Sequence, residues 1–363
     1  MSEPAVVMED IVHSFGAFVA LNDVSLTVEA GEFVVLLGPS GSGKTTLLSI
    51  LGGFLTPNEG TVTINGQDMT RVPPARRPTI TVFQDYALFP HMTIDENIAF
   101  GLIMHKVGKA ERTRRIADVL ELVGLPDAGS KKPHELSGGQ RQRVALARSL
   151  AVEPSVLLLD EPLGALDLKL RRQMQEELKD IQQRVGTTFI HVTHDQEEAM
   201  AIADQIVVMN EGRIEDKGTP ERVYLKPYSL FAASFMGETN FVVGAVEICG
   251  ARTLSVATEV GKLEVPVADD EHDLFPADTR VVLSIRPEHL TTTRRRKNFL
   301  DLGQVRVEAV GFVGTHHQCR TSHTGAAGVM PLIHLPQSEQ IEVGTELSLY
   351  ADPADVVVLP AEE

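Results

Sequence analysis

Cysteine is scarce in this sequence of 363 residues, which contains only Cys249 and Cys319. Two cysteines are too few for a disulfide framework, and their number is typical of a reducing compartment. Long apolar runs are also missing, because stretches such as FVVLL and VLLL are far shorter than the roughly 18 residues that span a bilayer. The sequence does not open with a charged and then apolar leader. We therefore expect a soluble protein of the cytoplasm.

Basic residues are in deficit as well, since 33 lysines and arginines face 50 aspartates and glutamates and leave a formal net charge of −17. A protein that binds nucleic acid over a broad surface needs a basic face, so this composition argues against that class. The one basic cluster is TRRRK at 293–297, and we interpret it as a solvated loop.

The rest of the composition is that of a globular protein, with 43% hydrophobic and 23% charged residues. The length is too great for one ordinary core and predicts two or three domains. Over residues 5–235, short apolar runs such as EFVVLLG, SVLLLD and TTFIHVTH alternate with segments of helical period. This alternation predicts an α/β fold with a mostly parallel sheet and sites at the carboxyl ends of its strands.

Two helical regions and a hairpin are expected within this pattern. Over 166–185, apolar residues recur every three or four positions and predict one buried stripe, made of Leu170, Met174, Leu178, Ile181 and Val185. Between about 85 and 150 the pattern becomes helical, and one face of ERTRRIADVLELVGL carries Ile116, Val119, Leu120 and Val123. We interpret 85–150 as a helical insert, and QIVVMNEGRIEDKG at 205–218 as a closing hairpin.

The pattern changes after Gly237. Short β-type runs, among them NFVVGAVEI, TRVVLSIRPEHL and QVRVEAVGFVG, are separated by glycine, proline or aspartate and show little helical period. We predict one domain over 1–237 and a separate small-barrel or sandwich domain over 238–363.

The segment GPSGSGKTT at 38–46 fits the phosphate-loop pattern G-x-x-x-x-G-K-[ST], with a predicted strand before it and a predicted helix after it. Its glycines allow the backbone to curl around phosphate oxygens, Lys44 would reach the β- and γ-phosphates, and the Thr45 hydroxyl could ligate Mg²⁺. The alternative is a glycine-rich turn without a ligand. The predicted nucleotide-binding positions are Gly38, Pro39, Ser40, Gly41, Ser42, Gly43, Lys44, Thr45 and Thr46.

The second motif is the acidic stretch SVLLLDEP, in which an apolar strand ends at Asp160. A carboxylate at that edge of the sheet can hold Mg²⁺. Glu161 follows directly and could orient and deprotonate a water molecule beside the γ-phosphate. A solvent-facing pair of acids is the alternative.

Four further motifs follow the same order along the chain as in one known family. They are Gln84 in VFQDYALFP, LSGGQ at 136–140, LGALD at 163–167 and HVTHD. The chain resembles the ATPase subunits of ATP-binding-cassette (ABC) transporters over nearly its whole length. The resemblance implies an α/β P-loop NTPase domain with a helical insert, followed by an all-β, OB-like (TOBE-type) domain. It also implies ATP and Mg²⁺ as cofactors.

The resemblance implies roles for further residues. Phe15 would stack on adenine, with a buried core phenylalanine as the alternative. Gln84 would contact Mg²⁺ or the attacking water, and His194 would hold that water and Glu161 in line. Asp167 would lie at a contact between two subunits. The resemblance thus implies Glu161, His194 and Gln84 as the catalytic residues. It implies Thr45, Gln84 and Asp160 as the residues that hold the metal.

The same family explains why a second glycine-rich turn, HELSGGQRQRVALARSL at 134–150, follows the phosphate loop. There LSGGQ caps the γ-phosphate bound by a second chain, so that a homodimer encloses two ATP molecules. This implies that Ser137, Gly138, Gly139 and Gln140 act in trans. The alternative is an ordinary helix cap in which Ser137 bonds to the start of its own helix.

The family also implies partners. Its importers pair the ATPase with integral membrane permease subunits and an extracytoplasmic solute-binding protein, on the cytoplasmic face of the inner membrane. Tyr86, Leu88, Phe89 and Pro90 are candidates for the contact with the permease, or else pack the helical insert. MGETNF at 236–241 resembles spermidine/putrescine or ferric-iron importers, with phosphonate and sugar importers as alternatives.

Two other interpretations are weaker. A soluble ABC ATPase without a transport role usually has a long coiled-coil insert or two cassettes, and neither is evident here. The cluster THHQC contains His316, His317 and Cys319, of which only 317 and 319 share a strand face. Two ligands are too few for a closed metal site, so we interpret this cluster as structural.

Overall fold

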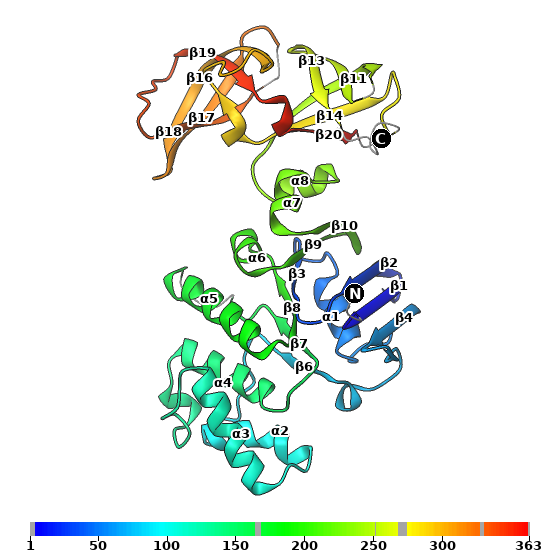
Figure 1. Ribbon diagram of the computed structural model, residues 1–363, viewed down its shortest axis with the longest axis vertical. Helices are drawn as coiled ribbons and strands as arrows, with labels where there is room; N and C mark the ends of the chain where they lie inside the picture. The colour runs from blue at the N-terminus through cyan, green and yellow to red at the C-terminus, as the bar shows by residue number, and fades with distance from the viewer. Residues whose placement is uncertain (1–3, 164–167, 251, 268–273, 327–329, 362–363) are drawn as a thin grey trace. The chain divides into compact units, whose positions relative to one another are not determined.

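The computed structural model describes residues 4–163, 168–250, 252–267, 274–326 and 330–361. The chain forms two compact units, Met1–Pro220 and Glu221–Glu363, which are shown in Figure 1. The division therefore falls ahead of the boundary that the sequence predicted at 237/238. Among the described residues, no helix has the length and the apolar character needed to cross a bilayer.

The first unit contains two sheets. The smaller one is antiparallel, with the order β2-β1-β4-β5, and the larger has the order β10-β9-β3-β8-β7-β6, in which all strands but β10 are parallel. The strands of the smaller sheet are β1 (Val6–Phe15), β2 (Phe18–Val28), β4 (Glu59–Ile64) and β5 (Gln67–Asp68). Those of the larger are β3 (Phe33–Leu37), β6 (Thr79–Val82), β7 (Val156–Asp160), β8 (Thr188–Thr193), β9 (Gln205–Asn210) and β10 (Arg213–Gly218).

The central strands of the larger sheet are almost wholly apolar because helices and the smaller sheet cover both of their faces. Every residue of β3 is buried, as are the first four of β7 and all six of β8. Such continuous burial is typical of parallel strands. The predicted α/β pattern is confirmed, and so is the hairpin at 205–218, since β9 and β10 pair antiparallel.

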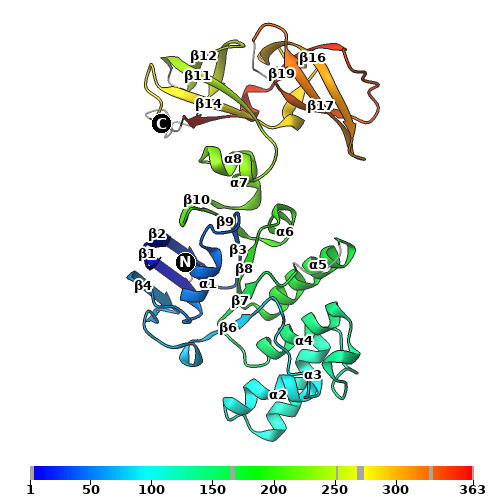
Figure 2. The same cartoon turned by 180° about the vertical axis from the view of Figure 1, so that it is seen from behind.

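Helices complete the first unit, and Figures 1 and 2 show α2, α3 and α4 grouped at one end of it. The stripe predicted for α5 is buried at Met174, Leu178 and Ile181, whereas Leu170 and Val185 are only half-buried. The start of α2 is fixed by a capping box between Thr93 and Glu96. The helices are α1 (Lys44–Leu51), α2 (Ile94–Met104), α3 (Lys109–Leu122), α4 (Gly138–Leu150), α5 (Leu168–Val185) and α6 (Gln196–Ile202), with 3₁₀ turns at Pro74–Arg76 and Pro133–Glu135.

The second unit consists of two five-stranded antiparallel sheets, with the orders β13-β12-β11-β14-β20 and β15-β19-β16-β17-β18. Both sheets contribute to one core, for example through Leu254 and Val281 from the first and Val305 and Cys319 from the second. The predicted all-β domain is therefore confirmed. Its elements are α7 (Pro220–Leu225), α8 (Leu230–Phe235), β11 (Asn240–Cys249), β12 (Thr253–Thr258), β13 (Gly261–Pro266), β14 (Arg280–Ile285), β15 (Leu290–Thr291), β16 (Leu300–Phe312), β17 (His316–His323), β18 (Leu332–Pro336), β19 (Glu346–Ala351) and β20 (Val356–Pro360).

One buried arginine explains why α8 and most of α7 belong to the second unit. Arg286 is 4% exposed and donates hydrogen bonds to the carbonyls of Tyr224, Ala233, Gly237 and Glu238, at 2.9 to 3.0 Å. These four carbonyls come from the two helices and from the segment that leads into β11. This link could not be predicted from the sequence, because the arginine lies 62 residues from Tyr224.

Candidate nucleotide-binding and catalytic site

Four neighbouring parallel strands end at one edge of the larger sheet, in the order β3, β8, β7 and β6 (Figure 1). The phosphate loop follows β3, His194 follows β8, Asp160 ends β7 and Gln84 lies shortly after β6. Because the carboxyl ends of parallel strands meet at one edge, these residues from four distant stretches of sequence converge. Gln84 is exposed there, in a turn.

The phosphate loop between β3 and α1 needs glycine at two positions. A Cβ atom on Gly38 would come within 2.2 Å of the Met209 carbonyl oxygen. Gly43 has a φ of 99°, and a Cβ atom there would meet the Ala20 carbonyl oxygen at 2.7 Å. The loop is therefore pressed against backbone on one side. On the other it exposes Ser40 and Gly41 and leads into the N-terminus of α1, where backbone N–H groups favour an anion.

Lys44 is folded over this loop. Its Nζ donates to the carbonyls of Gly38 at 2.9 Å and Pro39 at 2.7 Å and to the Ser42 hydroxyl at 3.2 Å. Burial lowers the pKa of Lys44, while the nearby carboxylates of Glu161 and Asp160 act in the opposite direction. Because a lysine ammonium is carried on a flexible stem, it can turn toward a phosphate when one enters the loop.

Asp160 and Thr45 form the part of the site that could hold a divalent cation. The Thr45 side chain acts on the Asp160 carboxyl group and favours its ionised form, so the two oxygens lie in one part of the site. Burial, followed by repulsion from Glu161, raises the pKa of Asp160. A bound cation would reverse this effect and favour the ionised carboxylate.

The donor set at Asp160 and Thr45 suits Mg²⁺ rather than a closed protein cage. Among the described residues, no three or more His, Cys, Asp or Glu side chains are grouped so that they could hold a metal ion. Magnesium usually takes one or two carboxylates and completes its shell with phosphate oxygens and water. The residues present therefore fit Mg²⁺ bound together with a nucleotide.

Glu161 and His194 face each other across neighbouring strands. The His194 Nδ1 lies 3.4 Å from Glu161 Oε1, and the two side chains are 62% and 31% exposed, respectively. The backbone of Glu161 has a positive φ of 46°, and its N–H donates to the Val192 carbonyl at 3.1 Å. The pair is thus open to water and held by backbone contacts, as a water-activating pair requires.

The turn that carries His194 is held by a residue that sequence reasoning missed. The buried Glu198 carboxylate accepts from the Thr193 hydroxyl at 2.8 Å and contacts His191 Nε2 at 2.7 Å. Thr193 in turn accepts from the N–H of Asp195 at 3.1 Å. A cue existed, since Asp195 and Glu198 have the spacing of a helix start, and Asp195 does accept from the Glu198 N–H.

Phe15 lies at the end of β1 in the smaller sheet. It is 51% exposed, pairs across the strands with Phe18 and packs edge-on against His13 at 4.8 Å between ring centres. The alternative that Phe15 is a buried core residue is therefore wrong. An exposed ring at the end of a strand is available for stacking on a base.

The LSGGQ turn caps its own helix in the single chain. Ser137 Oγ accepts from the Gln140 N–H at 3.3 Å, and the Gln140 side chain accepts from the Ser137 N–H at 3.0 Å. Ser137 is exposed, and its hydroxyl proton remains available because Oγ acts only as an acceptor in this bond. A Cβ atom on Gly138 would meet no neighbour within 4 Å, so this turn leaves space for a ligand. Asp167, the other residue expected at a subunit contact, lies outside the described residues.

The four candidates for a contact with a membrane subunit differ in how far their side chains are engaged within the chain. Tyr86 is half-buried and donates through its hydroxyl to the Pro162 carbonyl at 3.2 Å, and Phe89 packs on Phe100 at 4.8 Å between ring centres. These two side chains are thus engaged within the chain. Leu88 is half-buried and Pro90 is exposed.

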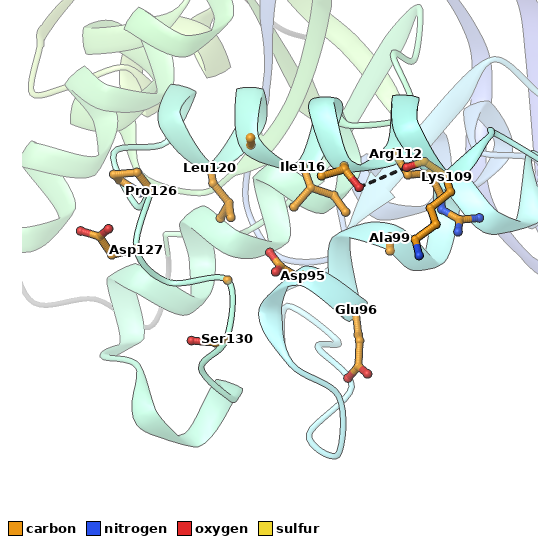
Figure 3. A pocket seen from close by; sticks show the side chains of 13 residues that line it. Asp95, Glu96, Ala99, Lys109, Arg112, Ile116, Leu120, Pro126, Asp127 and Ser130 are labelled. Atoms are coloured by element: carbon orange, nitrogen blue, oxygen red, sulfur yellow. Dashed lines mark hydrogen bonds between the residues drawn. The ribbon is translucent and has the colours of Figure 1, made fainter.

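A pocket of about 580 Å³ lies beside α2 and α3 (Figure 3). Figure 3 shows Ile116 and Leu120 of α3 lining it together with Asp95 and Glu96 of α2 and the loop at 126–130. Its lining contains none of the residues predicted for the nucleotide. Burial raises the pKa of Asp95, and the neighbouring Glu96 adds to the effect.

Comparison with known proteins agrees with this geometry. A family model described as ABC transporter matches residues 21–164, and one described as TOBE domain matches residues 283–359. A spermidine/putrescine import ATP-binding protein of Rubrobacter xylanophilus is 50% identical over 287 residues, which cover 79% of this chain and 76% of the relative. The chain belongs to the ABC transporter family.

Two further matches extend the comparison. A sulfate/thiosulfate import ATP-binding protein of Chromobacterium violaceum is 46% identical over 87% of this ABC chain and 83% of its own length. A solved ATP-binding cassette, described as a dimeric post-hydrolysis state bound to ADP and phosphate, is 34% identical with a TM-score of 0.52, covering 59% of this chain and 98% of that one. The predicted P-loop fold and OB-like domain are confirmed. The chain is the ATP-binding and ATP-hydrolysing component of an ABC transporter complex.

Proposed function

We propose that this ABC ATPase energises the import of a polyamine, spermidine or putrescine. The ATPase part is supported by one observation above all, the convergence of Lys44, Asp160, Glu161 and His194 at one sheet edge. The solute is supported by the relatives, since spermidine/putrescine import ATP-binding proteins match at 42% to 51% identity. Sulfate is the competing solute, because the sulfate/thiosulfate relative is similar to the same degree.

We infer the following roles in hydrolysis. Phe15 stacks on the base, the loop at 38–46 cradles the phosphates, and Lys44 moves from the loop carbonyls onto phosphate oxygens. Mg²⁺, held by Thr45 and Asp160 with Gln84 nearby, would neutralise charge on the phosphates. Glu161 takes a proton from the attacking water, and His194 keeps Glu161 and that water in line.

We infer that two copies of the chain complete two sites. The Ser137 hydroxyl and the N–H groups at the start of α4 would bind the γ-phosphate held by the partner copy, with Gly138, Gly139 and Gln140 forming the turn and Asp167 at the contact. The exposed position of Ser137 and the open space at Gly138 support this role. The γ-phosphate then acts as the switch, because its loss removes the contact that favours the closed dimer.

Membrane permease subunits and an extracytoplasmic solute-binding protein are the proposed partners, at the cytoplasmic face of the inner membrane. The pocket beside α2 and α3 is the proposed seat of a short permease helix. Its lining combines the apolar side chains of Ile116 and Leu120 with acidic ones, Asp95 and Glu96, and basic ones, Lys109 and Arg112, so it suits an amphipathic helix whose polar face carries charges of both signs.

The test is to purify a tagged copy of the chain from detergent-solubilised membranes of its native cell and to identify its companions by mass spectrometry. We expect one or two integral membrane subunits and a solute-binding protein that binds spermidine or putrescine. Binding of sulfate, ferric iron, phosphonate or a sugar instead would replace the solute and keep the importer. Recovery of soluble partners alone, with the chain abundant and folded, would contradict the importer assignment.

A further inference from the structure

Tyr86 connects the stretch after β6 that carries Gln84, residues 83–90 and here called the Gln84 segment, to the turn that carries Glu161. Its hydroxyl donates to the carbonyl of Pro162, the residue next to Glu161, at 3.2 Å. Burial raises the pKa of Tyr86, so the phenol keeps its proton and remains a donor. One side chain two positions after Gln84 therefore holds the backbone one position after Glu161.

Arg148 connects the same segment to the helix that starts at the LSGGQ turn. From α4, its guanidinium donates to the carbonyls of Ala87 at 2.7 Å and Tyr86 at 2.8 Å. It also lies over the ring of Phe89, with Cζ 5.6 Å from the ring centre. Burial lowers the pKa of Arg148, yet an arginine remains charged, so both are charge-assisted bonds.

The segment held in this way has a backbone that would not persist by itself. Tyr86 and Ala87 have φ values of 62° and 44°, in the left-handed region that residues with a Cβ atom rarely adopt. Such a conformation persists only where surrounding contacts enforce it. The Arg148 fork and the Tyr86 hydroxyl are contacts of this kind.

We propose that Tyr86 and Arg148 are positioning residues for ATP hydrolysis, which lock the Gln84 segment both to α4 and to the turn of Glu161. A shift of α4 then moves the Gln84 segment and Glu161 together, because one strained segment is bonded to both. The inference rests on the proposed roles of Gln84 and Glu161. It also assigns the Tyr86 side chain to the interior of the site rather than to the surface that would contact a membrane subunit.

The test compares Tyr86→Phe and Arg148→Lys in the purified full-length chain, without membrane subunits. Tyr86→Phe removes only the hydroxyl, and Arg148→Lys cannot reach two carbonyls with a planar fork. We expect kcat to fall about fivefold or more in each, with KM for ATP within about twofold and an unchanged melting temperature. The double variant should be no slower than the slower single variant, since both changes release one segment.

Matched controls are Tyr350→Phe in β19 and Arg114→Lys on the surface of α3, which should leave kcat unchanged. Unchanged kcat in Tyr86→Phe, or multiplying effects in the double variant, would overturn the proposal. Glu161→Gln is measured in parallel. If Glu161→Gln keeps its turnover, the proposed base role of Glu161 fails. If Glu161→Gln loses turnover while Tyr86→Phe keeps the kcat of the unchanged chain, only the positioning role of Tyr86 is contradicted.

Discussion

The two units each bury a cation among backbone carbonyls, and the comparison separates a binding site from a structural support. Lys44 of the first unit is bonded to two carbonyls and a hydroxyl, while Arg286 of the second is bonded to four carbonyls. Burial lowers the pKa of both. Lys44, however, also has the carboxylates of Asp160 and Glu161 nearby and a flexible stem, so it can exchange partners.

The surroundings of the two cations account for this difference. Lys44 lies where parallel strands end, and that edge collects polar residues from distant parts of the sequence. Arg286 follows β14 in an antiparallel sheet, where its planar fork joins the carbonyls of two helices and of the segment that leads into β11. A buried charge therefore indicates function only when its partners can be replaced.

The largest effect is expected at the water-activating pair. Glu161→Gln removes the proposed base, so turnover should fall on the order of 100-fold or more while ATP still binds. Single-turnover hydrolysis and nucleotide binding measure the two properties separately. The matched control is Glu197→Gln, an exposed acid on α6 that is paired with Arg172, and it should hydrolyse ATP normally. Normal turnover in Glu161→Gln would remove this residue from the base role.

Substitution of Lys44 should weaken ATP binding without lowering the stability of the fold. Lys44→Ala is expected to lower ATP affinity by about tenfold or more, because a charged hydrogen bond to phosphate is lost. The melting temperature should change little, since only two loop carbonyls lose this donor and Pro39 is only half-buried. A fall in melting temperature with unchanged affinity would place Lys44 in the same structural class as Arg286.

Substitution of Arg286 should have the opposite result, a loss of stability without a loss of ATP turnover. Arg286→Met leaves four carbonyls without their donor and should lower the stability of the second unit by about 2 kcal/mol, with ATP turnover unchanged. Tyrosine fluorescence can follow this unit, because the chain has no tryptophan and three of its four tyrosines lie beyond residue 220. Arg295→Met, at an exposed position, is the control. A wild-type denaturation midpoint in Arg286→Met would contradict the structural role.

The smallest effect concerns pH and the second unit. The ring of His334 packs on His316 in a tilted arrangement, with 3.9 Å between ring centres. It also lies 3.4 Å from Glu238 and 3.8 Å from Glu288, which accepts from Tyr224. Burial and then His316 lower the pKa of His334, although both carboxylates oppose the shift.

The sign of the pH effect follows from this lowered pKa. The unfolded chain, with a histidine pKa of about 6.5, binds a proton more readily than the folded one. Stability is therefore complete above that pH and falls as the pH decreases toward the lower folded value. His334→Gln should flatten the dependence of the urea midpoint on pH between 7.5 and 5.5, whereas His134→Gln in the first unit should not. An unchanged slope in His334→Gln would assign the dependence to other groups.

Local motifs allowed much of the site to be predicted from the sequence. The phosphate loop, Asp160 and Glu161 are each defined by a few consecutive residues at a strand end, where backbone geometry follows from the sequence. The positions of Tyr86, Arg148 and Glu198 could not be predicted in this way. The bond from Arg148 to Tyr86 spans 62 residues and depends on how α4 packs. The division at Pro220/Glu221 likewise depends on a distant contact, because Arg286 binds carbonyls of α7 and α8.

We propose that the converged edge of one chain is half of a nucleotide site, which a second copy of the chain completes. The direct measurement uses a Glu161→Gln background, in which chains with Lys44→Ala and chains with Ser137→Arg carry different tags and are co-expressed. Each variant alone should fail to retain ATP, and purified heterodimers should retain it in one intact composite site. Verified heterodimers that retain no ATP would contradict the claim.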